Sequence, residues 1–166
     1  QRVGPRILIL DHDKGLRLTT AERVAYMMAK GYTYGVHCLP HDAGSTWTGG
    51  LSFADEITKA GLKNVRLIRR TIDSERRIQG MWGYFPNLYF NEENTRHLLK
   101  SLENYHRKEE RKSGAICTEI VHDWASHDAD AFGYIFEAEQ AGLFYDSQAS
   151  SRGPSVRLAV VRAGRL

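Results

Sequence analysis

Residues 121–136 (VHDWASHDADAFGYIF) place several ionisable side chains in one short run. Asp123, His127 and Asp130 are spaced i, i+4 and i+7, so a helix that begins near here would carry all three on one side. Carboxylates with an imidazole can bind a divalent cation, which would relieve repulsion between the acids. The segment is equally consistent with a helix cap, in which Asp123 or Ser126 is the N-cap.

A second candidate lies in residues 34–44 (YGVHCLPHDAG). The segment 34–39 is strand-like, and His41 and Asp42 follow its carboxyl end. Ligands of open α/β sheets are bound at that edge, so Asp42 is a candidate metal ligand. Its position between a proline and a glycine is equally typical of a turn.

The elements that must position these side chains alternate along the chain. This alternation predicts an α/β fold with a mostly parallel sheet and helices on its faces. Capping residues mark several helix boundaries: Thr19 with Glu22, Ser52 and Asn91 at starts, and Gly31 and Gly61 at ends. The predicted strands are 6–10, 34–39, 65–68 and 88–90, and the predicted helices are 19–31, 52–61, 73–85, 91–111 and one that starts within 121–136.

Length and composition fit one domain of an ordinary globular protein. A chain of 166 residues can bury a core without disulfides, and 42% hydrophobic with 26% charged residues is typical of soluble proteins. We find no signal peptide and no apolar run near about 18 residues, so no membrane association is expected. Cys38 and Cys117 lack metal-ligand spacing and indicate a reducing compartment, by default the cytoplasm.

Positive charge is concentrated in residues 63–77 and 152–166, although the net charge is only +3. Such a surface is compatible with a polyanion partner and also with an ordinary solvated face. There is no Gly-rich phosphate loop of the ATPase type. The candidate phosphate contacts are Lys63, Arg69, Arg70, Arg76 and Arg77.

Together, YGVHCLPHDAG and VHDWASHDADAFGYIF resemble the nuclease domain of bacteriophage terminase large subunits, the motors that package and cut viral DNA. Members typically carry a Y-G-x-H-x-L-P-H-D-A strand end, a later basic strand, a charged helix with L-x-x-Y, and an H-D-W-x-S-H-x-A-D-A-F motif. Residues 34–43, 65–70, 102–105 and 122–132 match in that order. The resemblance assigns 1–145 to the nuclease domain and leaves 146–166 as a basic tail or an extra strand.

The resemblance implies an RNase H-like mixed sheet flanked by helices, and two Mg²⁺ or Mn²⁺ ions that support endonucleolytic cleavage of concatemeric double-stranded DNA. Asp42, Asp130 and His127 match its catalytic and metal-binding positions. His41, His122 and Asp123 match positions that orient ligands or face the substrate, and Asp128 stands where the family usually has a small residue. The implied partners are DNA, the terminase small subunit and the portal or procapsid, in the host cytoplasm.

One departure from the family concerns its first catalytic aspartate, which lies on an initial strand near a D-x-G pattern. Residues 6–10 align with a later strand, so we expect an N-terminally truncated domain in which Asp11 and Asp13 do not replace that ligand. Without it, we expect weak metal binding and cleavage that is slow or absent. Two alternatives stay open. One is a non-catalytic module that docks on DNA or protein, and the other is a metal phosphohydrolase that uses His41-Asp42 and His122-Asp123 as paired ligands.

Overall fold

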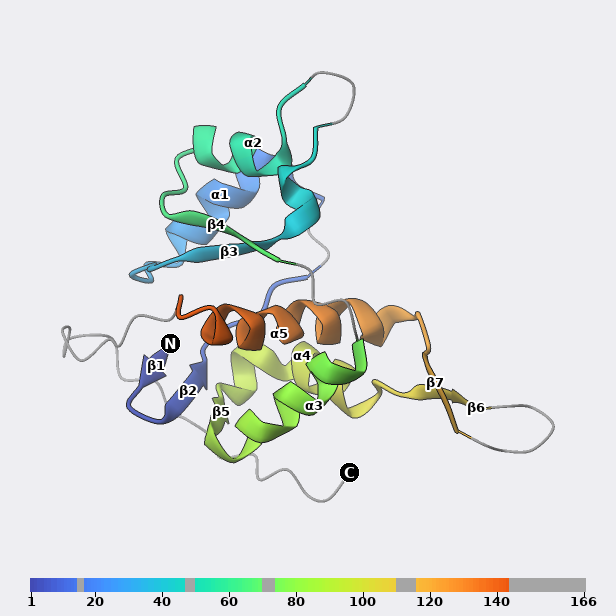
Figure 1. Ribbon diagram of the computed structural model, residues 1–166. Coiled ribbons are helices and arrows are strands. Elements are labelled where there is room, and N and C mark those ends of the chain that lie inside the picture. The colour runs from blue at the N-terminus through green and yellow to red at the C-terminus, as the bar shows by residue number, and fades with distance from the viewer. Residues whose placement is uncertain (15–16, 47–49, 70–73, 110–115, 144–166) are drawn as a thin grey trace. The chain divides into compact units, whose positions relative to one another are not determined.

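The computed structural model describes residues 1–14, 17–46, 50–69, 74–109 and 116–143 (Figure 1). They form two compact units. Unit 1 comprises Gln1–His12 and Asp73–Phe136, and unit 2 comprises Asp13–Ile72 and Glu137–Tyr145, within the ranges just given. The basic segment 152–166 and Arg70 lie outside the described residues.

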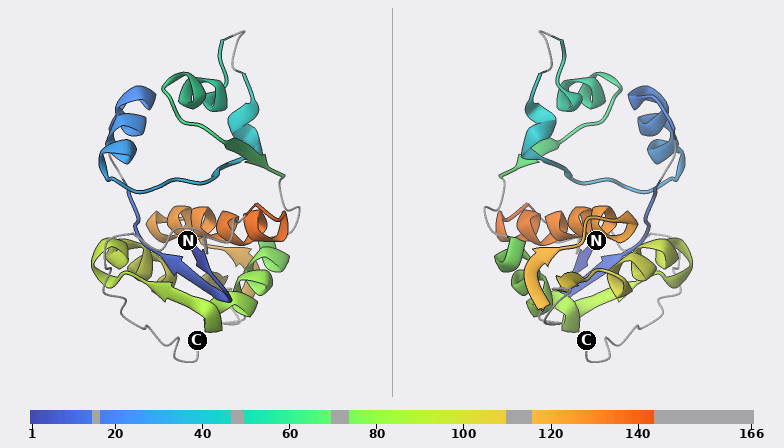
Figure 2. Two further views of the ribbon diagram at one scale, coloured as in Figure 1. Left: turned by 90° about the vertical axis from the view of Figure 1, so that its left-hand side faces the viewer. Right: turned by 90° about the vertical axis from the view of Figure 1, so that its right-hand side faces the viewer.

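Unit 1 contains a small sheet with the strand order β1-β2-β5. Strand β2 runs antiparallel to β1 and parallel to β5, with Ile7 opposite Leu88. Helices α3 and α4 lie on opposite sides of this sheet and α5 lies across it (Figure 2). The bounds are β1 Arg2–Val3, β2 Arg6–Ile9, α3 Ser74–Tyr84, the 3-10 helix η2 Phe85–Asn87, β5 Leu88–Phe90, α4 Glu92–Glu103, β6 Arg107–Glu109, β7 Ile116–Ile120 and α5 Trp124–Gln140.

The core of unit 1 forms because buried positions alternate along the strands and recur at helical spacing along the helices. In β2 the side chains of Ile7 and Ile9 are buried whereas Arg6 is exposed. The core side chains are Ile7, Ile9, Met81, Leu88, Phe90, Leu98, Phe132 and Phe136.

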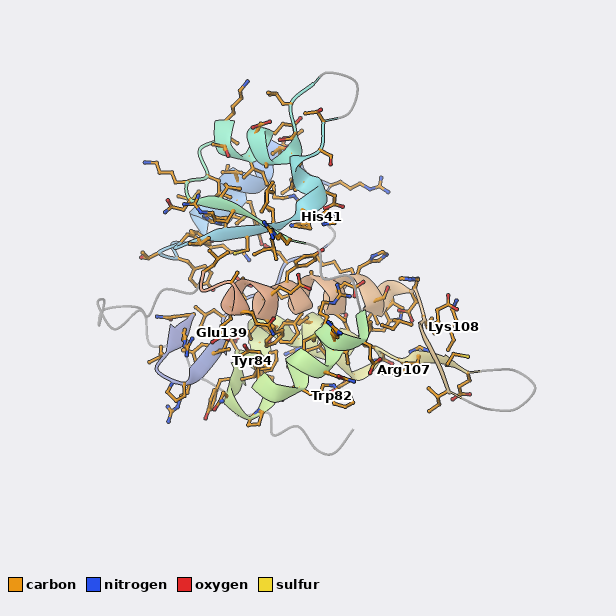
Figure 3. All side chains as sticks on the ribbon, in the orientation of Figure 1. His41, Trp82, Tyr84, Arg107, Lys108 and Glu139 are labelled. Carbon is orange, nitrogen blue, oxygen red and sulfur yellow. The ribbon has the colours of Figure 1, made fainter. Side chains whose placement is uncertain are left out.

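The predicted helix 91–111 is too long, because α4 ends at Glu103. Asn104 leaves the helical conformation, and its side-chain amide donates to the carbonyl of Lys100 at 2.7 Å, which satisfies one of the last helical acceptors. The chain then enters β6, which pairs antiparallel with β7. Arg107 and Lys108 project from this hairpin (Figure 3).

Unit 2 places two helices beside a pair of parallel strands, with His37 opposite Val65. The capping boxes of Thr19 with Glu22 and of Ser52 with Asp55 are both present, and Val24, Ile57 and Leu62 form the core. The bounds are α1 Thr20–Ala29, β3 His37–Pro40, the 3-10 helix η1 His41–Gly44, α2 Phe53–Lys59 and β4 Val65–Ile68.

The α/β class is confirmed, but the expected single parallel sheet is wrong for the described strands. Strand β2 pairs with β5, and β3 pairs with β4 in a separate sheet. Two large apolar side chains of the helices are exposed: Trp82 is 61% exposed (Figure 3) and Phe53 is 42% exposed. Met81 and Ile57 take the buried positions of those helices.

Within the described ranges, no helix is long and apolar enough to cross a bilayer.

Candidate functional site

Asp123 caps helix α5. Its Oδ1 accepts hydrogen bonds from the backbone N–H groups of Ala125 at 2.9 Å and Ser126 at 3.2 Å. The Ser126 hydroxyl in turn accepts from the backbone N–H of Asp123 at 3.2 Å. This is the capping arrangement that the sequence allowed, and it places Asp123 ahead of the first helical turn, apart from the helical face of His127 and Asp130.

The remaining acids of α5 leave the helix in different directions. Asp128 is buried and Asp130 is partly exposed, whereas His127 and the preceding His122 are exposed. Among the residues that the structure describes, no three His, Cys, Asp or Glu side chains lie where they could hold a metal ion together. The expected face of three ligands on α5 is therefore wrong.

Asp130 is held by two donors from other elements of unit 1. Its Oδ1 accepts from the guanidinium of Arg77 on α3 and from the phenol of Tyr105, after α4, at 3.2 Å. The side chains of Arg77 and Asp130 are 17% and 34% exposed. Burial, followed by the negative charge of Asp130, raises the pKa of Tyr105 to about 12, so the phenol keeps its proton at neutral pH.

Gly133 makes the contact between Arg77 and Asp130 possible. It lies three residues beyond Asp130 on the buried side of α5. A Cβ atom at Gly133 would lie 2.9 Å from Cδ and 3.2 Å from Nε of Arg77. The side chain of Arg77 therefore lies against the backbone of α5 at a point where a larger residue would push it away.

Asp128 forms a second polar cluster in unit 1. Its carboxylate accepts from the hydroxyl of Ser101 at 2.7 Å, and it lies 3.1 Å from Nδ1 of His97 and 3.6 Å from Nε2 of His12. The two imidazoles are stacked with centroids 5.8 Å apart, and His97 meets the ring of Trp124 edge-on. In the sequence this carboxylate stands out only as a departure from the family pattern. The i, i+4 spacing of His97 and Ser101 was the available signal.

In unit 2, His41 (Figure 3) and the following Asp42 form the first turn of η1, and both side chains are exposed. The carbonyl of Asp42 accepts from the N–H of Ser45 at 2.9 Å, as in a turn. A Cβ atom at Gly44 would lie 2.6 Å from Cδ1 of Leu67, so a glycine lets η1 approach β4. The local backbone thus presents Asp42 just beyond the carboxyl end of β3, as predicted.

The acids that follow β2 have local partners. Asp11 accepts from the backbone N–H of His12 at 2.8 Å. Asp13, in unit 2, forms an ion pair with Lys30 at 2.9 Å and accepts from the hydroxyl of Tyr26 at 3.3 Å.

The candidate phosphate contacts divide between the two units. Lys63 and Arg69 are exposed in unit 2, and Arg76 is exposed on α3 of unit 1. Arg77 differs from them because it is largely buried against α5 and paired with Asp130. Positive charge is thus available for a polyanion, while Arg77 already has an anionic partner within the chain.

No protein-family model, curated protein or solved structure matches this chain. The chemistry of the candidate site therefore has to be derived from the side chains of this chain alone. Carboxylates with an imidazole are a donor set that suits Mg²⁺ or Mn²⁺. In unit 1, Asp130 offers such a carboxylate to solvent only in part, because a guanidinium already occupies one oxygen.

Proposed function

We propose that the chain belongs to a metal-dependent DNA endonuclease of the terminase large-subunit type, with an RNase H-like fold. The observation that supports this proposal best is the position of Asp130, a partly exposed carboxylate on α5 that lies beside an arginine. Carboxylates that recruit cations and arginines that bind phosphate are the two requirements of a phosphodiester-cleaving site. The two sequence motifs, in the family's order, supply the rest of the support.

Under this proposal Asp130 and His127 in unit 1, and Asp42 in unit 2, are the residues that would bind divalent cations, because each matches a metal-binding position of the family motifs. Bound Mg²⁺ or Mn²⁺ supplies an activated water and neutralises charge on the attacking and leaving oxygens. Asp123 fixes the start of α5, and so the position of Asp130, through its two backbone hydrogen bonds. His41 and His122 are exposed neighbours of these residues that face solvent and substrate.

The proposed substrate is concatemeric double-stranded DNA in the cytoplasm of a bacterial host, with the terminase small subunit and the portal or procapsid as partners. Lys63, Arg69, Arg70, Arg76 and Arg77 would contact the sugar-phosphate backbone. Such contacts carry no sequence information and weaken as salt rises.

Cleavage of supercoiled plasmid by the purified chain in Mn²⁺ tests the proposal. We expect Asp130→Asn and Asp42→Asn each to abolish nicking while DNA binding, measured by fluorescence anisotropy, is retained. Glu103→Gln is the matched control, because Glu103 is an exposed acid at the end of α4. Cleavage by Asp130→Asn at the control's rate would contradict the proposal.

A chain that binds DNA but does not nick it, with or without the substitutions, would instead support the docking alternative. Metal-dependent release of phosphate from a nucleotide, lost in His41→Ala and His122→Ala, would support the phosphohydrolase. The same preparations serve all three assays, so the three functions are separated in one experiment.

A further inference from the structure

A cavity of about 370 Å³ lies in unit 2, between β4 and the last residues of α5. Arg66 and Arg69 line it from β4 and from the residue that follows this strand. Glu137 and Gln140 line it from the end of α5. A cavity of this volume suits one small ligand.

The carboxylate of Glu137 is the unusual group in this cavity. Both of its oxygens are buried, and among the described residues none donates a hydrogen bond to either. Arg66 and Arg69 line the same cavity, yet within the described part of the chain neither forms an ion pair with Glu137. Burial of a carboxylate without donors is unfavourable. A ligand with N–H donors at one end and an anionic group at the other would satisfy both walls.

The last turn of α5 shapes one wall of the cavity. The N–H of Gly142 donates to the carbonyl of Glu139 at 2.8 Å, and the N–H of Leu143 donates to that of Ala138 at 3.0 Å. These are the two hydrogen bonds of a Schellman motif, which turns the chain back on the helix. Leu143 thereby lines the cavity, and the buried Ile68 adds a second apolar side chain. Such side chains can pack against a flat ring.

We propose that this cavity binds a guanine mononucleotide. Glu137 and Gln140 are three residues apart on α5 and so share one helical face. The carboxylate can accept from N1–H and from the N2 amino group of guanine, while the amide of Gln140 donates to O6. Adenine and cytosine pair one amino group with a ring nitrogen that accepts, and thymine and uracil have one N–H between two carbonyls. Guanine is thus the base that presents two adjacent donors.

The two arginines supply the phosphate end of the site. A guanidinium carries five N–H donors and binds phosphate through two parallel hydrogen bonds. Nη1 of Arg66 donates to the carbonyl of Val65 at 3.1 Å, which holds this side chain along β4. Arg66 and Arg69 are exposed, so the phosphate stays near solvent while the base reaches the buried oxygens of Glu137. This site does not depend on the proposed nuclease function, because neither Glu137 nor Arg66 takes part in it.

Isothermal titration calorimetry with nucleotides tests the proposal on the wild-type chain. We expect guanosine monophosphate to bind roughly tenfold more tightly than inosine monophosphate, which lacks the N2 amino group and loses one hydrogen bond to a charged acceptor. Adenosine monophosphate should bind more weakly still, because its ring nitrogen N1 is an acceptor that faces the carboxylate. Inorganic phosphate is the probe for binding by the arginines alone.

Two substitutions test the two ends of the site separately. Glu137→Gln replaces one acceptor oxygen by a donor, so affinity for guanosine monophosphate should fall roughly tenfold and the preference over inosine monophosphate should shrink. Arg66→Gln should weaken the monophosphate by a similar factor but leave guanosine, which has no phosphate, unaffected. Lys59→Gln is the matched control, because Lys59 is an exposed cation of α2 that does not line the cavity.

Equal affinity of the wild-type chain for the three monophosphates would overturn the proposal, since a merely basic surface binds by charge alone. Failure to bind any nucleotide would overturn it as well, as would unchanged binding by folded Glu137→Gln. The comparison of nucleotides needs no variant, so it holds even if a substitution prevents folding. Selective binding of guanosine monophosphate without plasmid cleavage would support this site and contradict the nuclease alone.

Discussion

Nδ1 of His97 lies 3.1 Å from Oδ2 of Asp128, a residue on the neighbouring helix whose side chain is only 8% exposed. Ser101, one turn further along α4, donates to the same oxygen at 2.7 Å. One buried acid thus joins α4 to α5 through two side chains of a single helical face. The cluster is part of the architecture of unit 1, and it can be tested without any assumption about function.

Asp128→Ala should lower the free energy of unfolding by about 1 kcal/mol, because it removes the carboxylate that accepts from Ser101 and lies beside His97, while the Ser101 hydroxyl can still donate to the carbonyl of His97. Asp128→Asn should cost less, since an amide oxygen can still accept from Ser101. Urea unfolding followed by circular dichroism measures both, with Glu103→Gln as the exposed control. A midpoint for Asp128→Ala equal to that of the control would contradict a stabilising role.

Gly133→Ala should show opposite effects in two backgrounds. Alanine is favoured over glycine within a helix by about 1 kcal/mol. In the wild-type chain this gain is offset, because the new Cβ lies 2.9 Å from Cδ of Arg77. In an Arg77→Ala background the obstacle is absent, and the substitution should stabilise the chain. A double-mutant cycle of unfolding free energies measures the coupling, and additivity would show that the arginine does not lie over this glycine.

Tyr105 should titrate at higher pH than a tyrosine ordinarily does. Burial, and then the charge of Asp130, raises its pKa from 10.0 to about 12. A raised pKa means that the native state binds the proton more tightly than the unfolded state. The stabilisation is therefore complete below the unfolded pKa, near 10, and is lost as pH rises through about 12.

The ultraviolet absorbance of tyrosinate, compared between the wild-type chain and Tyr105→Phe, isolates this group. The difference titration should have its midpoint near 12. Asp130→Asn should lower that midpoint, because the negative charge that opposes ionisation is removed. A midpoint at the ordinary value of 10.0 in the wild-type chain would show that the phenol is neither buried nor bonded to Asp130.

Removal of the cap of α5 should destabilise unit 1. Asp123→Ala deprives the N–H groups of Ala125 and Ser126 of their acceptor and should cost about 1 kcal/mol. Asp123→Asn and Asp123→Ser keep a capping oxygen and should cost less. Thermal unfolding of the three variants gives the order. Equal losses in all three would indicate that the negative charge of Asp123 matters more than its hydrogen bonds.

Local features of the fold were predictable from the sequence. The capping box at Thr19 and the caps at Ser52 and Asn91 occur as expected, because caps depend on residues within one turn. The pairing of β2 with β5 was not predictable from strand order. It joins residues about 80 positions apart, and the choice depends on which apolar faces complete the core of unit 1.

The candidate site likewise has local features that the sequence predicts and long-range contacts that it does not. The motif points to Asp130, but its partners Arg77 and Tyr105 come from two other elements, and no spacing within 121–136 reveals them. Asp128 breaks the family pattern, yet it is the more deeply buried of the two acids. Burial depends on the neighbouring helix, and periodicity within one helix does not supply that information.

Asp128 and Asp130 are two residues apart on α5, so their side chains leave the helix axis about 200° from each other. One is tethered to α4 and the other to α3. Together they set the azimuth of α5, the angle through which it is turned about its own axis. Deletion or insertion of a single residue between them would rotate one tether by about 100° relative to the other, so only one could stay engaged.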